Sequence, residues 1–136
     1  MTSASPPVDD ATLRAAGDEV VRLLRARDYA SIAQRHGYLL AHGTPPATAI
    51  RVDVEAALAQ ARTTMDALGV ASHDLVRYEP NDTGLLAVLE IQWPAPEKTR
   101  GLLVALVVLQ GEGAPRIQLE DIGAWDEDPS SHDEAS

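Results

Sequence analysis

The sequence predicts an α+β domain in which three N-terminal helices pack on a curved, four-stranded antiparallel meander. Apolar residues recur with the period of an α-helix up to about residue 70 and with the period of a strand from residue 73 onward. The apolar run at 101–109, GLLVALVVL, is too short for a membrane-spanning helix, which takes about 20 residues. Read as a strand, the run is apolar on both faces, so both faces must be covered.

Cap residues and helical spacing delimit the first two helices. The first is expected to begin after an N-cap at Asp10 or Thr12 and to end near Arg25. Asp28 is a second N-cap, and Gly37 is the expected C-terminal stop of a short second helix. These signals predict two consecutive helices separated by only a few residues.

A third helix is expected over about 51–68, where apolar residues fall at i, i+4, i+7, i+11 and i+14. Gly69 should end this helix. Asp53 and Glu55 would then lie in its first turn, where the helix dipole favours negative charge. A short apolar segment, 38–41, precedes the helix and its loop.

Alternating apolar residues predict four strands, and their short connections favour antiparallel pairing. The strands are expected at 74–79, 85–93, 101–109 and 116–122. In the second strand one face holds Leu85, Ala87, Leu89, Ile91 and Trp93, and the other holds Leu86, Val88, Glu90 and Gln92. The alternation of the fourth strand slips at Asp121-Ile122, which predicts a bulge or the end of the strand.

Composition sets the domain limits and the expected compartment. Residues 1–10 are polar and Pro-containing, and residues 126–136 hold five acids and no base, so both segments are expected to be disordered. A single domain over 11–125 remains. The N-terminus does not resemble a signal peptide, so the cytoplasm is the default location. The absence of Cys excludes disulfides, thiol catalysis and Cys-ligated metal sites.

Charge is unevenly distributed along the chain, which has a net charge of −10. Residues 1–70 carry 8 acids and 7 bases, whereas residues 71–136 carry 13 acids and 4 bases. An acidic surface repels nucleic-acid phosphates and anionic membranes, so neither is an expected partner. A basic protein would be attracted. The simpler interpretation is that the acidity only maintains solubility.

The order of these elements resembles a known family. Ala26-Arg27-Asp28-Tyr29 joins the first two helices, Leu68-Gly69 ends the third, and the meander closes near Trp125. In this order the chain resembles small NTF2-like (cystatin-like, cone-shaped) domains over about residues 12–125. The resemblance implies a strongly bent sheet around the helices, an apolar cavity at the open end, and dimerisation through the sheet. It implies no catalytic residue, because no active-site motif of the family matches this sequence.

His36 is the most informative histidine, because it shares the predicted buried face of the second helix with Tyr29. With Tyr38 and an acid such as Asp53 it could supply a general acid–base site, if a cavity exists. The simpler interpretation is a half-buried histidine at the end of a helix. None of the four histidines has metal-ligand spacing with an acid, so no metal or cofactor is expected.

Glu90 and Gln92 share a face of the second strand with apolar residues. On a concave face they would be polar groups of a cavity, and on an outer face they would mark an interface. A plain solvent-exposed edge is the simpler interpretation. Trp93 lies on the opposite face and is expected in the core rather than in a ligand site.

The sequence therefore favours a non-enzymatic protein-binding module. Toxin-neutralising immunity proteins and inhibitors, which act through an acidic or sheet surface, fit this description. A homodimer is expected, formed through the uncovered face of the sheet. Two alternatives stay open: a ligand-binding or acid–base enzyme with an NTF2-like cavity, and a dimerising structural domain without a ligand.

Overall fold

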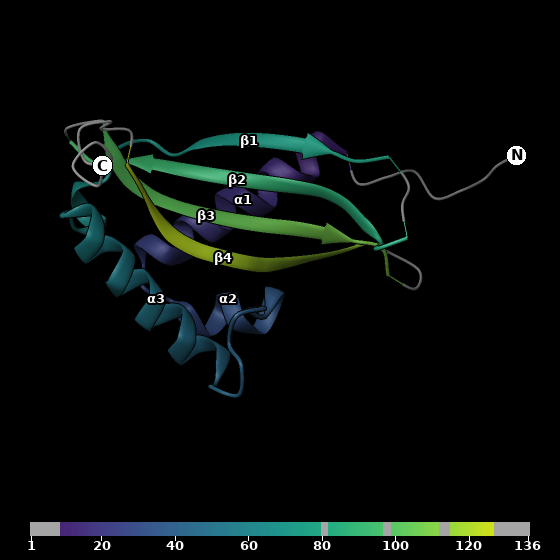
Figure 1. The fold of residues 1–136 in the computed structure, drawn as a ribbon, viewed down its shortest axis with the longest axis horizontal. Helices are drawn as coiled ribbons and strands as arrows, with labels where there is room; N and C mark the ends of the chain where they lie inside the picture. The colour runs from purple at the N-terminus through teal and green to yellow at the C-terminus, as the bar shows by residue number, and fades with distance from the viewer. Residues whose placement is uncertain (1–8, 80–81, 97–98, 112–114, 127–136) are drawn as a thin grey trace, which may run out of the picture.

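The computed structural model describes residues 9–79, 82–96, 99–111 and 115–126. These residues form the predicted fold, with three helices preceding a four-stranded antiparallel sheet of order β1-β2-β3-β4. The elements are α1 (Asp10–Arg25), α2 (Tyr29–His36), α3 (Pro46–Ala61), a 3₁₀ turn η1 (Met65–Ala67), β1 (Ser72–Arg77), β2 (Leu85–Pro94), β3 (Arg100–Leu109) and β4 (Arg116–Asp126). In Figure 1, α1 crosses behind β2 and β3 while α2 and α3 lie on the β4 side, so the sheet face toward the viewer carries no helix.

Both N-terminal helices begin at an aspartate cap. The carboxylate of Asp9 accepts from the backbone N–H of Thr12 at 2.8 Å, so α1 is capped one residue before the expected position. Asp28 caps α2 as expected by accepting from the N–H of Ser31 at 3.2 Å. Gly37 then ends α2 with φ of 68°, a conformation that costs glycine little. The segments expected to be disordered lie, apart from residues 9–10 and Asp126, outside the described residues.

The third helix differs from the prediction at both ends. It spans Pro46–Ala61 rather than 51–68, and Pro46 suits the first helical position because its missing N–H needs no partner there. The helix ends where Arg62 adopts a left-handed conformation with φ of 59°. The apolar period persists beyond this point because η1 and the residue after it bury Met65 and Leu68. Asp53 therefore lies inside α3 and not in its first turn.

The strands match the prediction except at some ends. β1 lies two residues earlier than expected, and β4 continues to Asp126. The expected irregularity of β4 is confirmed as a bulge: Ala105 pairs with Asp121 and Leu106 with Leu119, which leaves Glu120 as the extra residue.

The core fills the space between the helices and one face of the sheet. It is built largely from aliphatic side chains and one tryptophan. Its largest fully buried members include Leu24, Ile32, Ile50, Leu89, Ile91, Trp93, Leu102, Leu106 and Leu119. Among the described residues, no helix is both long enough and apolar enough to cross a bilayer.

Several contacts fix α1 against the β1–β2 hairpin, including an ion pair between Asp10 and Arg77. Gly17 lets the helix approach closely, since a Cβ at this position would lie 2.8 Å from the ring of His73 and from a methyl group of Leu89. The Nε2 atom of His73 lies 3.3 Å from a carboxylate oxygen of Asp18. These contacts hold α1 over the first hairpin, on the side of the sheet opposite the uncovered face.

Candidate functional site

The sheet face that points away from the helices is called the open face (Figure 1). Residues directly opposite each other in antiparallel strands share a face, so the register defines its members. The face is made by Ser72, Asp74, Val76, Val88, Glu90, Gln92, Leu103, Ala105, Val107, Gln118, Asp121 and Gly123. It therefore includes the second side of β3, which the sequence left without a cover.

The centre of the open face is apolar. Val76 lies opposite Val88, which lies opposite Val107, and these three residues are called the valine row. Val76 is 44% exposed, Val88 is half-buried and Val107 is only 4% exposed. An antiparallel sheet with one solvated face normally presents polar side chains there. The β1–β2 part of the valine row, Val76 and Val88, is therefore accessible for contact with another apolar surface.

A row of carboxylates runs beside the valine row. Asp74 lies directly opposite Glu90, and the same row continues through Ala105 to Asp121 on β4. Asp74, Glu90 and Asp121 are called the acid row. Like charges directly opposite each other in a sheet destabilise it. Asp74 and Glu90 have no hydrogen-bond or ion-pair partner among the residues that the structure describes.

The bulge places a further acid at the β4 end of this row. Glu120 and Asp121 are consecutive and both exposed. The charge of Asp121 also reaches the neighbouring phenol of Tyr38, where it contributes to a raised pKa after the larger effects of burial and of Asp53. Negative potential is thus concentrated at the β4 edge as well as at the β1–β2 pair.

His36 is fixed by the backbone of β4. Its Nδ1 atom lies 3.0 Å from the carbonyl oxygen of Ile117, and because a carbonyl only accepts, Nδ1 carries the proton. Its Nε2 atom has no hydrogen-bond partner in the described part of the chain and lies 3.9 Å from a carboxylate oxygen of Glu19. Glu19 also forms an ion pair with Arg35. The side chain of His36 is only 9% exposed, so the ring joins α2 to β4 from a buried position.

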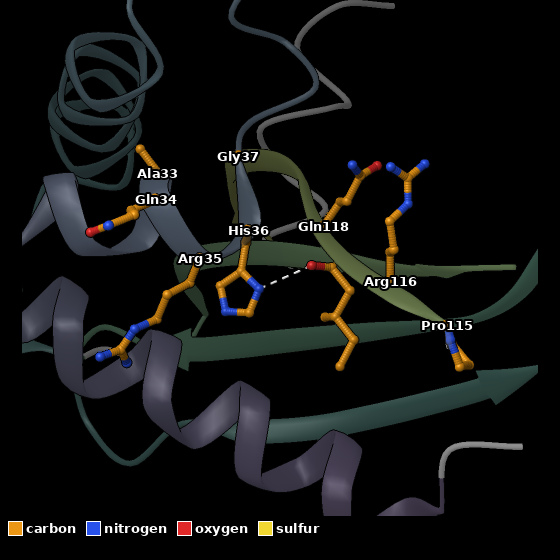
Figure 2. A pocket seen from close by; sticks show the side chains of 9 residues that line it. Ala33, Gln34, Arg35, His36, Gly37, Pro115, Arg116 and Gln118 are labelled. Carbon is orange, nitrogen blue, oxygen red and sulfur yellow. Dashed lines mark hydrogen bonds between the residues drawn. The ribbon is translucent and has the colours of Figure 1, made fainter. Parts of the chain in front are cut away.

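A groove of about 550 Å³ lies between the end of α2 and the start of β4. Arg35, His36, Arg116 and Gln118 contribute to its lining. Figure 2 shows Arg35 and Arg116 extending in different directions, and the Nε2 atom of His36 turned away from Arg116 and Gln118. A substrate site needs polar groups that converge on one point. The polar groups that line this groove do not converge in this way (Figure 2).

The structure brings together two of the three candidate acid–base residues. The hydroxyl of Tyr38 donates to a carboxylate oxygen of Asp53 at 2.5 Å. Burial, followed by this hydrogen bond, raises the pKa of Tyr38 well above its ordinary value. His36 is held by Ile117 and faces Glu19 instead. The Tyr38–Asp53 contact thus links the segment after α2 to α3.

Glu90, Gln92 and Trp93 lie where the alternation of β2 placed them. Glu90 and Gln92 are on the open face, half-buried and exposed respectively. Trp93 is fully buried on the helix side, with the guanidinium of Arg25 at 5.6 Å from the ring centroid. Trp93 is a core residue, and the two polar residues belong to the candidate surface.

Asp74 is the main site residue that the sequence reasoning missed. Its alternation with Leu75 already placed it on the face of Val76, but its position opposite Glu90 depends on the register of two strands. Aligning the buried residues of the two strands predicts the pairing of Asp74 with Glu90.

Among the described residues, no group of three His, Asp or Glu side chains could hold a metal ion. No protein-family model, curated protein or solved structure matches the chain.

Proposed function

We propose that this protein is a non-enzymatic binding module whose open face docks a basic protein partner. The observation that carries the proposal is the Asp74–Glu90 pair, which lies beside the valine row and has no ion-pair partner among the residues that the structure describes. Apolar patches rimmed by polar residues mark interaction sites. An immunity or inhibitor protein acting in the cytoplasm is one class of protein that would work in this way.

The charge of the open face selects among its possible occupants. The segment 127–136 of the chain itself carries four acids and no Lys or Arg, so the acid row would repel it. A two-fold homodimer through this face would bring the same surface of each copy together, including both acid rows. A basic partner instead neutralises the acid row while its apolar groups cover the valine row. We therefore favour a heteromeric complex over the homodimer expected from the sequence.

The acid–base enzyme is the weaker alternative. It would require a free base that faces a substrate. The Nε2 atom of His36, which has no hydrogen-bond partner in the described part of the chain, is turned away from Arg116 and Gln118 (Figure 2). The NTF2-like resemblance is compatible with either function, since that family contains enzymes and partner-binding domains.

The experiment compares three full-length proteins. They are the wild type, the Asp74→Asn/Glu90→Gln variant, and a matched control, Glu55→Gln/Asp66→Asn, which removes the same charges from exposed positions outside the sheet. Each is used to purify partners from the source cells. The partner retained by the wild type is then produced separately, and its Kd is measured by calorimetry at several salt concentrations.

We expect the partner to be basic and to bind the control as tightly as the wild type. The Asp74→Asn/Glu90→Gln protein, called the sheet variant, should bind the partner at least about tenfold more weakly, because two charges at the interface are lost. Affinity for the wild type should fall as salt rises. Equal binding by the sheet variant, or protection of α1–α3 rather than β1–β3 from hydrogen exchange in the complex, would refute the proposal.

A further inference from the structure

We infer that the partner segment seated on the open face is an α-helix that lies across the strands, with a basic stripe beside an apolar stripe. This inference rests on the proposed function and specifies the partner. It follows from the direction and the separation of the acid row and the valine row.

Both rows run at right angles to the strands. Neighbouring strands lie about 4.8 Å apart. Asp74 and Glu90 are one strand apart, and Glu90 and Asp121 are two strands apart, so successive carboxylates are spaced by about 5 Å and about 10 Å. The acid row therefore spans about 14 Å, from one edge strand to the other.

The valine row is parallel to the acid row. Val76 follows Asp74, and Val88 precedes Glu90, by two residues along a strand. Val107 follows Ala105 by two residues, and Ala105 lies between Glu90 and Asp121 in the register. Two residues correspond to about 7 Å. The open face thus presents one charged line and one apolar line, side by side at this separation.

A helix matches both lines at once. Basic residues at i, i+4 and i+11 lie within about 40° of one another around the helix and span about 16 Å along its axis. Apolar residues at i+3 and i+7 lie on the adjacent side, about 80° and about 40° from the middle of the basic stripe. At about 4.5 Å and about 10.5 Å along the axis they are level with Val88 and Val107. An extended segment presents only one line of side chains to a surface, with a period of about 7 Å, and cannot serve both rows.

The positions of the carboxylates along the acid row also suit such a helix. The extra acid at Glu120 adds to Asp121 at the β4 end, whereas Asp74 and Glu90 define the other end. A helix with basic residues at both ends of its stripe would therefore meet carboxylates at both ends. The middle of the row is Ala105, which leaves room for a small or apolar residue.

The test uses synthetic alanine-rich peptides of about 18 residues, long enough to form a helix. The matched peptide has Arg at i, i+4 and i+11 and Leu at i+3 and i+7. A second peptide has the same composition, with Leu moved to the side of the helix opposite Arg. A third alternates Arg and Leu with Thr and Val to favour an extended chain. Binding is measured by fluorescence anisotropy against the wild type, the sheet variant and the matched control described above.

We expect the matched peptide to bind the wild type and the control at least about tenfold more tightly than either other peptide, since only it serves both rows. Replacing Asp74 and Glu90 should weaken it at least about fivefold. Val88→Gln should weaken it as well, because it places an amide in the valine row.

The outcomes separate this inference from the proposed function. If all three peptides bind equally and all lose affinity with the sheet variant, the open face is a docking surface but the partner is not specifically helical. If the purified partner uses the open face through an extended segment, the helix inference fails alone. If neither the peptides nor the partner respond to Asp74→Asn/Glu90→Gln, both are overturned.

Discussion

The phenol of Tyr38 couples the stability of the fold to alkaline pH. Burial and the contact with Asp53 raise its pKa above the ordinary value of about 10. Above that pH the unfolded chain releases the phenol proton while the folded chain retains it. The contribution of Tyr38 is therefore complete below about pH 10 and is lost as pH rises toward the folded-state pKa.

We predict that Tyr38→Phe removes this part of the pH dependence. Urea unfolding at pH 8 and at pH 10.5 should show a smaller loss of stability for the variant than for the wild type. At pH 8 the variant should be less stable by about 0.5–1.5 kcal/mol, because a hydrogen bond is lost. Tyr29 also has a raised pKa through burial, so Tyr29→Phe measures its share separately. An unchanged difference between the two pH values would contradict the assignment.

His36 is predicted to stabilise the fold rather than to take part in turnover. His36→Ala should lower the free energy of unfolding by about 1–3 kcal/mol, because the carbonyl of Ile117 loses its donor and buried contacts are lost. His36→Asn, whose amide can reach a similar position, should recover part of the loss. Chemical denaturation provides the measurement. Partner affinity should be the same for all three proteins at temperatures where they are folded.

At the scale of elements, β1 and β2 pair at a cost. Because Asp74 and Glu90 repel each other, Asp74→Asn or Glu90→Gln should raise the free energy of unfolding by about 0.2–1 kcal/mol. High salt should reduce the difference by screening the wild-type repulsion. The control Asp66→Asn should change stability little. A destabilised Asp74→Asn protein would mean that the carboxylate has a stabilising partner.

The packing of α1 on the sheet decides whether Gly17→Ala raises or lowers the free energy of unfolding. In an isolated helix Gly17→Ala would add about 1 kcal/mol of stability. Here the new Cβ would lie 2.8 Å from His73 and Leu89, both largely buried, so we expect a net loss of about 1–3 kcal/mol. Thermal unfolding of Gly17→Ala, beside the exposed helix variant Ala15→Gly, tests this sign. A stabilised Gly17→Ala protein would show that α1 can move away from the sheet.

Local signals explain which elements the sequence could predict. The sequence predicts both ends of α2 because Asp28 caps its first turn and Gly37 directly follows its last residue. The predicted end of α3 is wrong for two reasons. The helix ends at Arg62, which adopts a left-handed conformation where a glycine would be the usual signal. The apolar period also continues through Met65 and Leu68, which lie in and directly after a 3₁₀ turn. Glu90 and Gln92 were placed by alternation within one strand. Their opposition to β1 depends on contacts between strands, which no single segment encodes.

At the scale of the whole molecule, the acid row limits association of the free protein. Two copies meeting through their open faces would place their carboxylates together, at a cost that salt reduces. We predict that the Asp74→Asn/Glu90→Gln variant self-associates more than the wild type at low salt, because its open face is less charged and still apolar. Sedimentation equilibrium tests this prediction, with Glu55→Gln/Asp66→Asn as control. A wild-type dimer that the sheet variant does not strengthen must use another surface.

The strand order β1-β2-β3-β4 has a consequence for how the chain reaches its fold. Every strand pairs with its neighbour in the sequence, so each pairing closes only a short loop and the sheet has a low contact order. Hairpins of this kind form within microseconds, faster than a sheet with crossover connections could assemble. We therefore expect rapid folding, with stopped-flow kinetics limited by the docking of the helices rather than by strand pairing. During that interval both faces of the meander are open to other chains, and the carboxylates of β1 and β2 protect one face from aggregation from the start.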